Sequence, residues 1–341
     1  MEYQLISFKK ALEISSGESK RHVLLGNGFS IACRQNIFRY DSLFEQADFS
    51  SLNPNIKRVF EALGTKDFEV VMKTLKTSSA ILQLYSPQDD GLSQLLINDA
   101  EDLKKILVNT IASSHPESPA DISNTEYSHC KSFLSNFNNF YTLNYDLLLY
   151  WACMHVEEGE EVISDDGFRT PDSGQAEYVS WDIEKTDQQN LFYLHGALHI
   201  FDAGAELKKY TWINTGVKLI EQIRTALDAN LFPLFVSEGK TIEKLERIVH
   251  SNYLSRGMRS LAHIGGALFV HGHSMASNDS HILNLIPKSK IKKLFISLHG
   301  DISNAANQTI IESAVKLVNK RKTKTQLELF FYDSESAKVW G

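Results

Sequence analysis

The stretch from His22 to Ser30 reads HVLLGNGFS: an apolar run, two glycines around an asparagine, and the start of a helical pattern. An apolar run without alternation is typical of a strand buried on both faces, as strands of parallel sheets are. The glycines fit a tight strand-to-helix turn, and they would let a phosphate approach free N–H groups at the helix start. This stretch predicts an α/β fold. It leaves open whether the turn binds a ligand, although Ile31 breaks the GxGxxG pattern of dehydrogenases.

The same apolar runs recur along the chain, with segments of helical period between them. This alternation predicts a mostly parallel, Rossmann-like sheet of about six or seven strands, with helices on both faces and right-handed crossovers. The predicted strands are His22–Leu25, Phe140–Leu143, Leu191–Leu194, Pro233–Val236, Ala267–Val270, Lys293–Leu298 and Leu327–Tyr332. The predicted helices between them are Leu147–Val156, Val217–Leu227, Thr241–Tyr253, His281–Ile286 and Ala305–Lys320.

Residues 55–114 interrupt the alternation, because they hold amphipathic helical segments and no strand. Turn-rich stretches flank them, SLNPN before and SSHPESP after. We therefore predict one α/β domain formed by residues 1–54 and 115–341, with residues 55–114 as a helical insertion. A second irregular region, residues 157–190, is rich in Asp, Glu, Gly and Ser, and predicts long loops with a hairpin at AEYVSW.

Composition excludes several classes of protein. The 341 residues carry 35 Lys and Arg against 42 Asp and Glu, so no overall positive field favours direct binding of nucleic acid. Three widely spaced cysteines, Cys33, Cys130 and Cys153, can build neither a disulfide framework nor a four-cysteine zinc site, and they fit a reducing cytoplasm. The chain shows no signal-peptide core and no run of ~18 apolar residues, so we expect a cytoplasmic protein without a membrane anchor.

Polar residues follow the predicted strands, which matters because open parallel sheets bind ligands beyond the carboxyl ends of their strands. Asn144-Tyr145-Asp146 follows the second strand, where Asn or Asp alone would only cap the next helix. His195 ends the third strand, as either a core histidine or a titratable group at the rim. If all strands point the same way, these groups converge on one rim. The other strand-end groups are Gly26–Ser30, Ser237–Gly239, His271–Ser274, His299–Asp301 and Asp333–Ser334.

Two further patterns resemble known ligand sites less well. The first is the cluster of His271, His273, Asp279 and His281. Its spacing differs from the tight HxHxDH of binuclear hydrolases, and its Gly- and Ser-rich loop suits phosphate or ribose better, but a metal-dependent hydrolase stays an alternative. The second is Ser237–Thr241, which lacks the first glycine of a phosphate loop because residue 234 is Leu, so a Walker-type nucleotidase is not expected.

Taken in chain order, the strand-end motifs resemble the sirtuin (Sir2) NAD-binding core, and more closely its bacterial Sir2-like branch, which includes the DUF4917 family. Gly26–Ser30 resembles the GAGxS opening of that core, and Thr142–Asp146 resembles its TQNID. Leu194-His195-Gly196 resembles the LHG that carries the family's catalytic histidine. Phe38-Arg39 is retained from the IPDFR segment, and Gly272–Ser274 lies where GTS or GSS contacts ribose and phosphate. Each motif is short; their order makes the match specific.

The resemblance implies a role for each residue. It implies that the diphosphate of NAD is held by Gly26, Asn27, Gly28 and Ser30. It also places Phe38 and Arg39 among the residues that bind NAD. Asn144 would lie by the nicotinamide ribose and position water, Asp146 would recognise the carboxamide, and His195 would be the general base. Gly272 and Ser274 would contact the adenosine ribose, and Asp301 would lie near the adenine.

Departures from the sirtuin pattern refine the expected activity. The four cysteines of the sirtuin zinc module are missing, and ALHIFDAG after Gly196 does not resemble the peptide-binding strand of deacylases. The resemblance therefore implies a metal-free NAD hydrolase, a latent effector of bacterial antiphage defence that forms ADP-ribose and nicotinamide. Because constant activity would be toxic, it also implies control by homo-oligomerisation, by the helical insertion or by a regulatory partner protein. A non-catalytic NAD or ADP-ribose sensor is the alternative.

Overall fold

The computed structural model describes residues 3–88, 91–155, 162–171, 176–204, 206–211, 217–229, 231–236, 248–322 and 326–341. The predicted motif Ser237–Thr241 and most of the predicted helix Thr241–Tyr253 lie outside the described residues. Within the described part, strands and helices alternate along much of the chain, as the sequence predicts.

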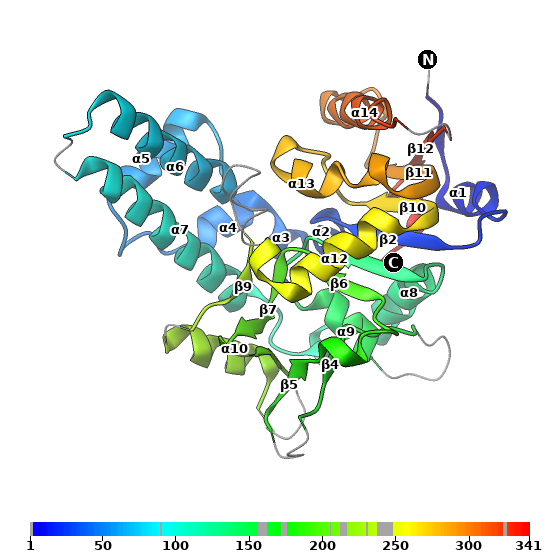
Figure 1. Ribbon diagram of the computed structural model, residues 1–341, viewed down its shortest axis with the longest axis horizontal. Helices are drawn as coiled ribbons and strands as arrows, with labels where there is room; N and C mark the ends of the chain where they lie inside the picture. The colour runs from blue at the N-terminus through cyan, green and yellow to red at the C-terminus, as the bar shows by residue number, and fades with distance from the viewer. Residues whose placement is uncertain are drawn as a thin grey trace.

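A seven-stranded parallel sheet forms the centre of the molecule (Figure 1), which confirms the predicted fold class. Its strands, in spatial order, are β1 (Leu5–Ile6), β12 (Glu328–Asp333), β11 (Lys290–Leu298), β10 (Gly265–His271), β2 (Arg21–Leu25), β3 (Asn139–Thr142) and β6 (Leu191–Tyr193). Every neighbouring pair is parallel. The carboxyl ends of all seven strands therefore meet at one edge.

Helices flank the sheet on both faces (Figure 1). Connections such as α1 (Phe8–Ile14) and α8 (Asn124–Leu134) lead toward β6, whereas α12 (Asn252–His263) and α14 (Ala305–Val318) lead toward β1. Right-handed crossovers that travel in opposite directions place their helices on opposite faces. The other α-helices that lie wholly within the described residues are α2 (Gly28–Cys33), α3 (Gln35–Phe38), α4 (Tyr40–Gln46), α5 (Asn55–Leu63), α6 (Phe68–Tyr85), α7 (Leu92–Ser114), α9 (Leu148–Met154), α10 (Leu219–Asp228) and α13 (Ser280–Leu283).

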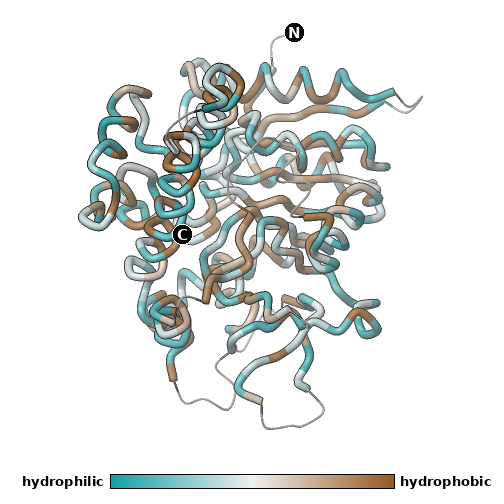
Figure 2. The backbone as a smooth tube through the Cα atoms, turned by 60° about the vertical axis from the view of Figure 1, so that its left-hand side comes forward, coloured by the Kyte–Doolittle hydropathy of each residue, from teal (hydrophilic) through white to brown (hydrophobic). Residues whose placement is uncertain are grey.

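Apolar side chains of the central strands and of the helices that cover them form the core. Phe8 of α1 and Phe133 of α8 pack against each other, and Phe8 also packs edge-on against Phe269 of β10. Figure 2 shows hydrophobic residues concentrated in the inner strands and hydrophilic residues on the outer turns of the helices. None of the helices in the described part of the chain combines the length and hydrophobicity that crossing a bilayer requires.

A second sheet of five antiparallel strands was not predicted as a sheet, although its strand β5 (Tyr178–Trp181) lies in the hairpin predicted at AEYVSW. The order of this sheet is β4 (Phe168–Arg169), β5, β8 (Leu207–Tyr210), β7 (Gly196–Asp202) and β9 (Pro233–Phe235). The prediction that Pro233–Val236 joins the parallel sheet is wrong, because β9 pairs antiparallel with β7. A three-residue buried run does not reveal which sheet it joins; the seventh parallel strand is the two-residue β1 instead.

The helices α5, α6 and α7 lie within residues 55–114 and project to one side of the parallel sheet (Figure 1). They are not isolated from it. Phe44 of α4 packs against Phe60 of α5, and Leu107 and Ile111 of α7 reach the cavity described below. The division into a sheet domain and a helical insertion stays a prediction.

Candidate functional site

A cavity of about 1070 Å³ lies at the carboxyl edge of the parallel sheet. Residues that follow six of its strands line it: Gly26, Asn144, His195, Gly272, His299 and Ser334. Every residue assigned to the site from the sequence lines this cavity except Ser30 and Asp301. The strand-end groups thus lie around one space, as parallel strands require.

Glycines at the floor of the cavity let two loops cross in close contact. A Cβ on Gly26 would lie 2.7 Å from the carbonyl oxygen of Gly272, and one on Gly28 would lie 2.6 Å from the Cα of Gly272. The Gly26 N–H donates to His271 O over 2.9 Å, and the Gly28 N–H donates to Gly272 O over 2.8 Å. Backbone packing therefore requires both glycines whether or not a ligand binds.

The expectation of free N–H groups at the start of α2 is wrong for four residues. Besides Gly26 and Gly28, the N–H of Phe29 donates to Gly26 O and that of Ser30 donates to Asn27 O, each over 3.0 Å. The physical reason is that carbonyl oxygens accept these hydrogen bonds: those of His271 and Gly272 at the end of β10, and those of the turn before α2. A diphosphate in this cavity would therefore depend on side-chain cations, and Arg39 and Lys338 line it.

Asn144, Ser30 and Asp146 form a buried hydrogen-bonded network beside the glycine crossing. The Ser30 hydroxyl donates to Asp146 Oδ2 over 2.5 Å, and Asn144 Nδ2 donates to Ser30 Oγ over 2.8 Å and to Gly26 O over 3.1 Å. Asn144 does not cap α9; the other oxygen of Asp146 accepts from the Leu148 N–H over 2.9 Å. Burial raises the pKa of the Asp146 carboxyl, and the Ser30 hydrogen bond opposes that rise. The network fixes the Asn144 amide at the cavity wall.

His195 lies where the chain leaves the parallel sheet for the antiparallel one. β6 ends at Tyr193 and β7 begins at Gly196, whose φ of +83° lies in the left-handed region. A Cβ on Gly196 would lie 1.8 Å from Leu234 O, so no larger residue fits. This turn holds His195, which is 3% exposed, between the two sheets. The ring of Tyr145, which stacks on Phe235, lies beside the His195 ring.

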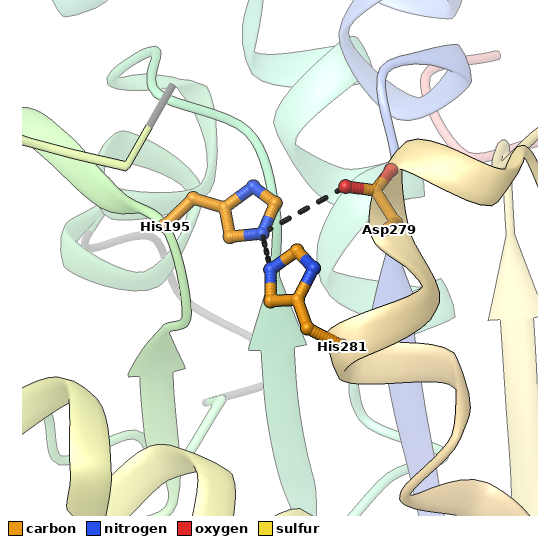
Figure 3. Close-up of side chains that lie close together, drawn as sticks. All are labelled: His195, Asp279 and His281. Carbon is orange, nitrogen blue, oxygen red and sulfur yellow. Dashed lines mark hydrogen bonds and ion pairs between the residues drawn. The ribbon is translucent and has the colours of Figure 1, made fainter. Parts of the chain in front are cut away.

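Two further polar side chains, His281 and Asp279, approach His195 (Figure 3), and His273 contacts Asp279. His195 Nε2 lies 2.9 Å from His281 Nε2 and 3.8 Å from Asp279 Oδ1. The other carboxylate oxygen of Asp279 lies 3.0 Å from His273 Nε2. The Met275 N–H donates to His273 Nδ1 over 2.9 Å, so that His273 presents its protonated Nε2 to Asp279. The segment after β10 thereby contributes three side chains to the surroundings of His195.

His271 stays apart from this group, although it was considered with His273 and Asp279 as a metal-ligand set. Its Nδ1 lies 2.9 Å from the Tyr332 hydroxyl, and its ring packs against Phe133. Burial lowers the pKa of His271 to about 4, so the ring is neutral at physiological pH. The structure therefore groups Asp279 with His195, His281 and His273 rather than with His271.

The remaining assigned residues lie at the periphery. Asn27 Nδ2 donates to Phe38 O over 2.9 Å, which ties the glycine loop to the segment that carries Arg39. Ser274 is exposed at the cavity wall. Asp301 uses its carboxylate locally, because Oδ1 accepts from the Ser303 N–H over 2.7 Å. Its carboxylate thus shapes the loop before α14.

Sequence reading missed several residues of the wall. Trp340 is buried, donates from Nε1 to Phe29 O over 2.9 Å and lines the cavity with Lys338. Glu69, at the start of α6, also lines the cavity, and its carboxylate lies 3.4 Å from Asn278 Nδ2. A tryptophan shortly after the last strand was the one available signal, whereas the place of Glu69 depends on how α6 packs.

Comparisons with known proteins give the following matches. A family model described as "Domain of unknown function (DUF4917)" matches residues 23–340. A solved structure described as "The Structural basis of Sirtuin Substrate Affinity" is 12% identical, with 92% of this chain and 99% of that chain covered and a TM-score of 0.37. For a "Sir2 homolog-NAD complex" the identity is 14%, the covered shares are 93% and 98%, and the TM-score is 0.33. No protein with a curated description matches.

Proposed function

Because this chain belongs to the DUF4917 family, whose description gives no activity, we propose its function from its own cavity: it hydrolyses NAD to ADP-ribose and nicotinamide. Membership in DUF4917 confirms the resemblance predicted from the sequence. One observation carries the proposal: Asn144 and His195, which follow different strands, line the same cavity. An amide oxygen that orients water and a ring that accepts a proton are the two groups that this hydrolysis requires.

The cavity offers the remaining parts of a dinucleotide site. Its volume of about 1070 Å³ slightly exceeds the ~300–1,000 Å³ typical of ligand pockets, which leaves room for a dinucleotide. Arg39 and Lys338 supply positive charge for a diphosphate, and the Asn144 amide and His195 ring lie on other parts of the wall. Apolar side chains such as Ile31 and Leu143 complete the lining and suit the faces of a base or a nicotinamide ring.

The proposed reaction breaks the bond between C1′ of the nicotinamide ribose and the nicotinamide nitrogen. The electron pair of that bond leaves with nicotinamide, and positive charge develops on the ribose in an oxocarbenium-like transition state. A water oxygen then bonds to C1′, and the proton of that water passes to His195. Asn144 orients the water or the ribose through Oδ1, because Nδ2 is held by Gly26 O and Ser30 Oγ. Asp146 holds Ser30 and thereby the amide.

The proposal is tested by incubating the purified 341-residue chain with NAD. Chromatography quantifies nicotinamide and ADP-ribose, and calorimetry measures NAD binding. We expect stoichiometric release of both products. Saturable NAD binding without products would favour the alternative, a sensor that binds NAD or ADP-ribose without turnover. Absence of both binding and products would contradict both functions.

Replacement of Asn144 by alanine tests the water-positioning role. We expect kcat to fall by about 100-fold, in the range that positioning one reactant contributes, while the Kd for NAD changes by less than about fivefold. The matched control is Asn190→Ala, which also removes an amide that donates to backbone carbonyls, those of Asn138 and Ile163, but lies outside the cavity lining. Equal kcat values in the two variants would show that Asn144 only supports the loop.

A further inference from the structure

Three side chains at or next to the cavity wall bring potential metal ligand atoms close together (Figure 3). They belong to His195, Asp279 and His281, and one ligand atom of each lies within 4.8 Å of those of the other two. The Nε2 nitrogens of the two histidines are 2.9 Å apart, and Asp279 Oδ1 is 3.8 Å from His195 Nε2. Bonds of ~2.0–2.2 Å to a tetrahedral zinc ion place ligand atoms about 3.3 Å apart. The two nitrogens are closer together than in a zinc coordination shell and the Asp279 oxygen is farther away, so zinc binding requires these side chains to move.

The donor set selects a class of metal. Two imidazole nitrogens and one carboxylate oxygen suit zinc and its first-row neighbours, whereas magnesium and calcium prefer oxygen ligands alone. The protein supplies three ligands here, and the cavity beside them leaves a fourth position for water. Both histidines are buried, and the Asp279 side chain is 15% exposed, so competition from bulk water is weak.

A second layer of contacts orients the carboxylate. His273 Nε2 donates to Asp279 Oδ2 over 3.0 Å, and the Met275 N–H fixes the tautomer of His273 through Nδ1. With Oδ2 held in this way, Oδ1 is directed at His195 Nε2. Partners of this kind fix metal ligands in place and commonly change metal affinity by ~10–100-fold.

The two imidazole nitrogens, 2.9 Å apart, lie at hydrogen-bond distance, so they share either one proton or one metal ion. A neutral imidazole carries one N–H and one lone pair, so either one ring donates its Nε2–H to Nε2 of the other ring, or a metal ion takes the place of that proton. We propose that His195, Asp279 and His281 form a binding site for zinc, and that zinc bound there inhibits the chain. The inhibition rests on the proposed function: a neutral imidazole has one basic nitrogen, and a metal on Nε2 leaves His195 unable to accept a proton.

Metal titration of the 341-residue chain tests the site. After treatment with EDTA and dialysis, zinc chloride is added in a calorimeter, and cobalt chloride is added in parallel while visible absorption is recorded. We expect one zinc per chain and the visible bands of tetrahedral cobalt. His281→Gln and Asp279→Asn should each weaken zinc binding by at least about 10-fold. His299→Gln is the matched control, because His299 lines the same cavity but faces Glu335.

The outcomes of these experiments test the zinc site separately from the proposed NAD hydrolysis. Absence of saturable zinc binding, or equal affinity in the wild type and in folded His281→Gln and Asp279→Asn, overturns the site. Circular dichroism of each variant shows that it is folded. Where NAD is hydrolysed, zinc should suppress nicotinamide release in the wild type at the concentrations that saturate the site, and activation by zinc would overturn the inhibition. Failure of NAD hydrolysis under all conditions leaves the metal titration decisive for the site.

Discussion

Replacement of His195 by alanine should lower nicotinamide release by about 10²–10⁴-fold, the contribution typical of a positioned acid or base. The ring is buried between two sheets and lines the same cavity as Asn144, so removal of the ring takes away the only group to which the proposal assigns the proton. NAD affinity should change by less than about 10-fold, because the cations proposed for the diphosphate remain. Single-turnover assays and calorimetry measure the two quantities separately.

Control variants decide whether the loss is specific to the base. His263→Ala removes an exposed histidine at the end of α12, outside the cavity lining, and should keep the full rate. His195→Gln retains a polar side chain of similar reach and should be as slow as His195→Ala, because an amide does not accept the proton. A His195→Ala protein with more than half of the wild-type rate would remove His195 from the mechanism.

Sequence patterns predicted the parallel sheet well because its strands are buried on both faces. The run HVLL became β2, and Lys293–Leu298 lies within β11, since fully buried strands are continuous apolar runs. The two-residue β1 is too short to leave a pattern. β9 has the same local pattern as a parallel strand, but its partner is β7, and pairing of this kind depends on contacts distant in sequence.

The candidate site likewise has a part that the sequence predicts and a part that it does not. The placement of Asn144 and His195 on one cavity follows from strand direction, which alternation of strands and helices predicts. Contacts between the loops do not follow from strand direction. Ser30 contacts Asp146 across 116 residues of chain, and His195 contacts His281 across 86 residues. Such pairs depend on how the loops pack over the edge of the sheet, and this packing cannot be predicted from patterns in a single sequence.

Gly196→Ala should cause the largest loss of stability among the substitutions discussed here. The new Cβ would lie 1.8 Å from Leu234 O, and the φ of +83° disfavours any residue with a side chain. The clash is with backbone of β9, so relief requires the two strands to separate. We expect the free energy of unfolding to fall by more than about 4 kcal/mol, or the chain not to fold. Urea denaturation followed by circular dichroism measures the change.

Gly204→Ala is the matched comparison, because Gly204 has a φ of +81° but nothing within 4 Å of its Cβ position. That variant carries the conformational strain alone and should lose only about 1–2 kcal/mol. The difference between the two variants isolates the contact with β9. If Gly196→Ala is as stable as Gly204→Ala, then the turn that holds His195 tolerates a side chain. In that event the glycine of the Leu194-His195-Gly196 motif needs a functional explanation, such as close approach of the substrate to the backbone.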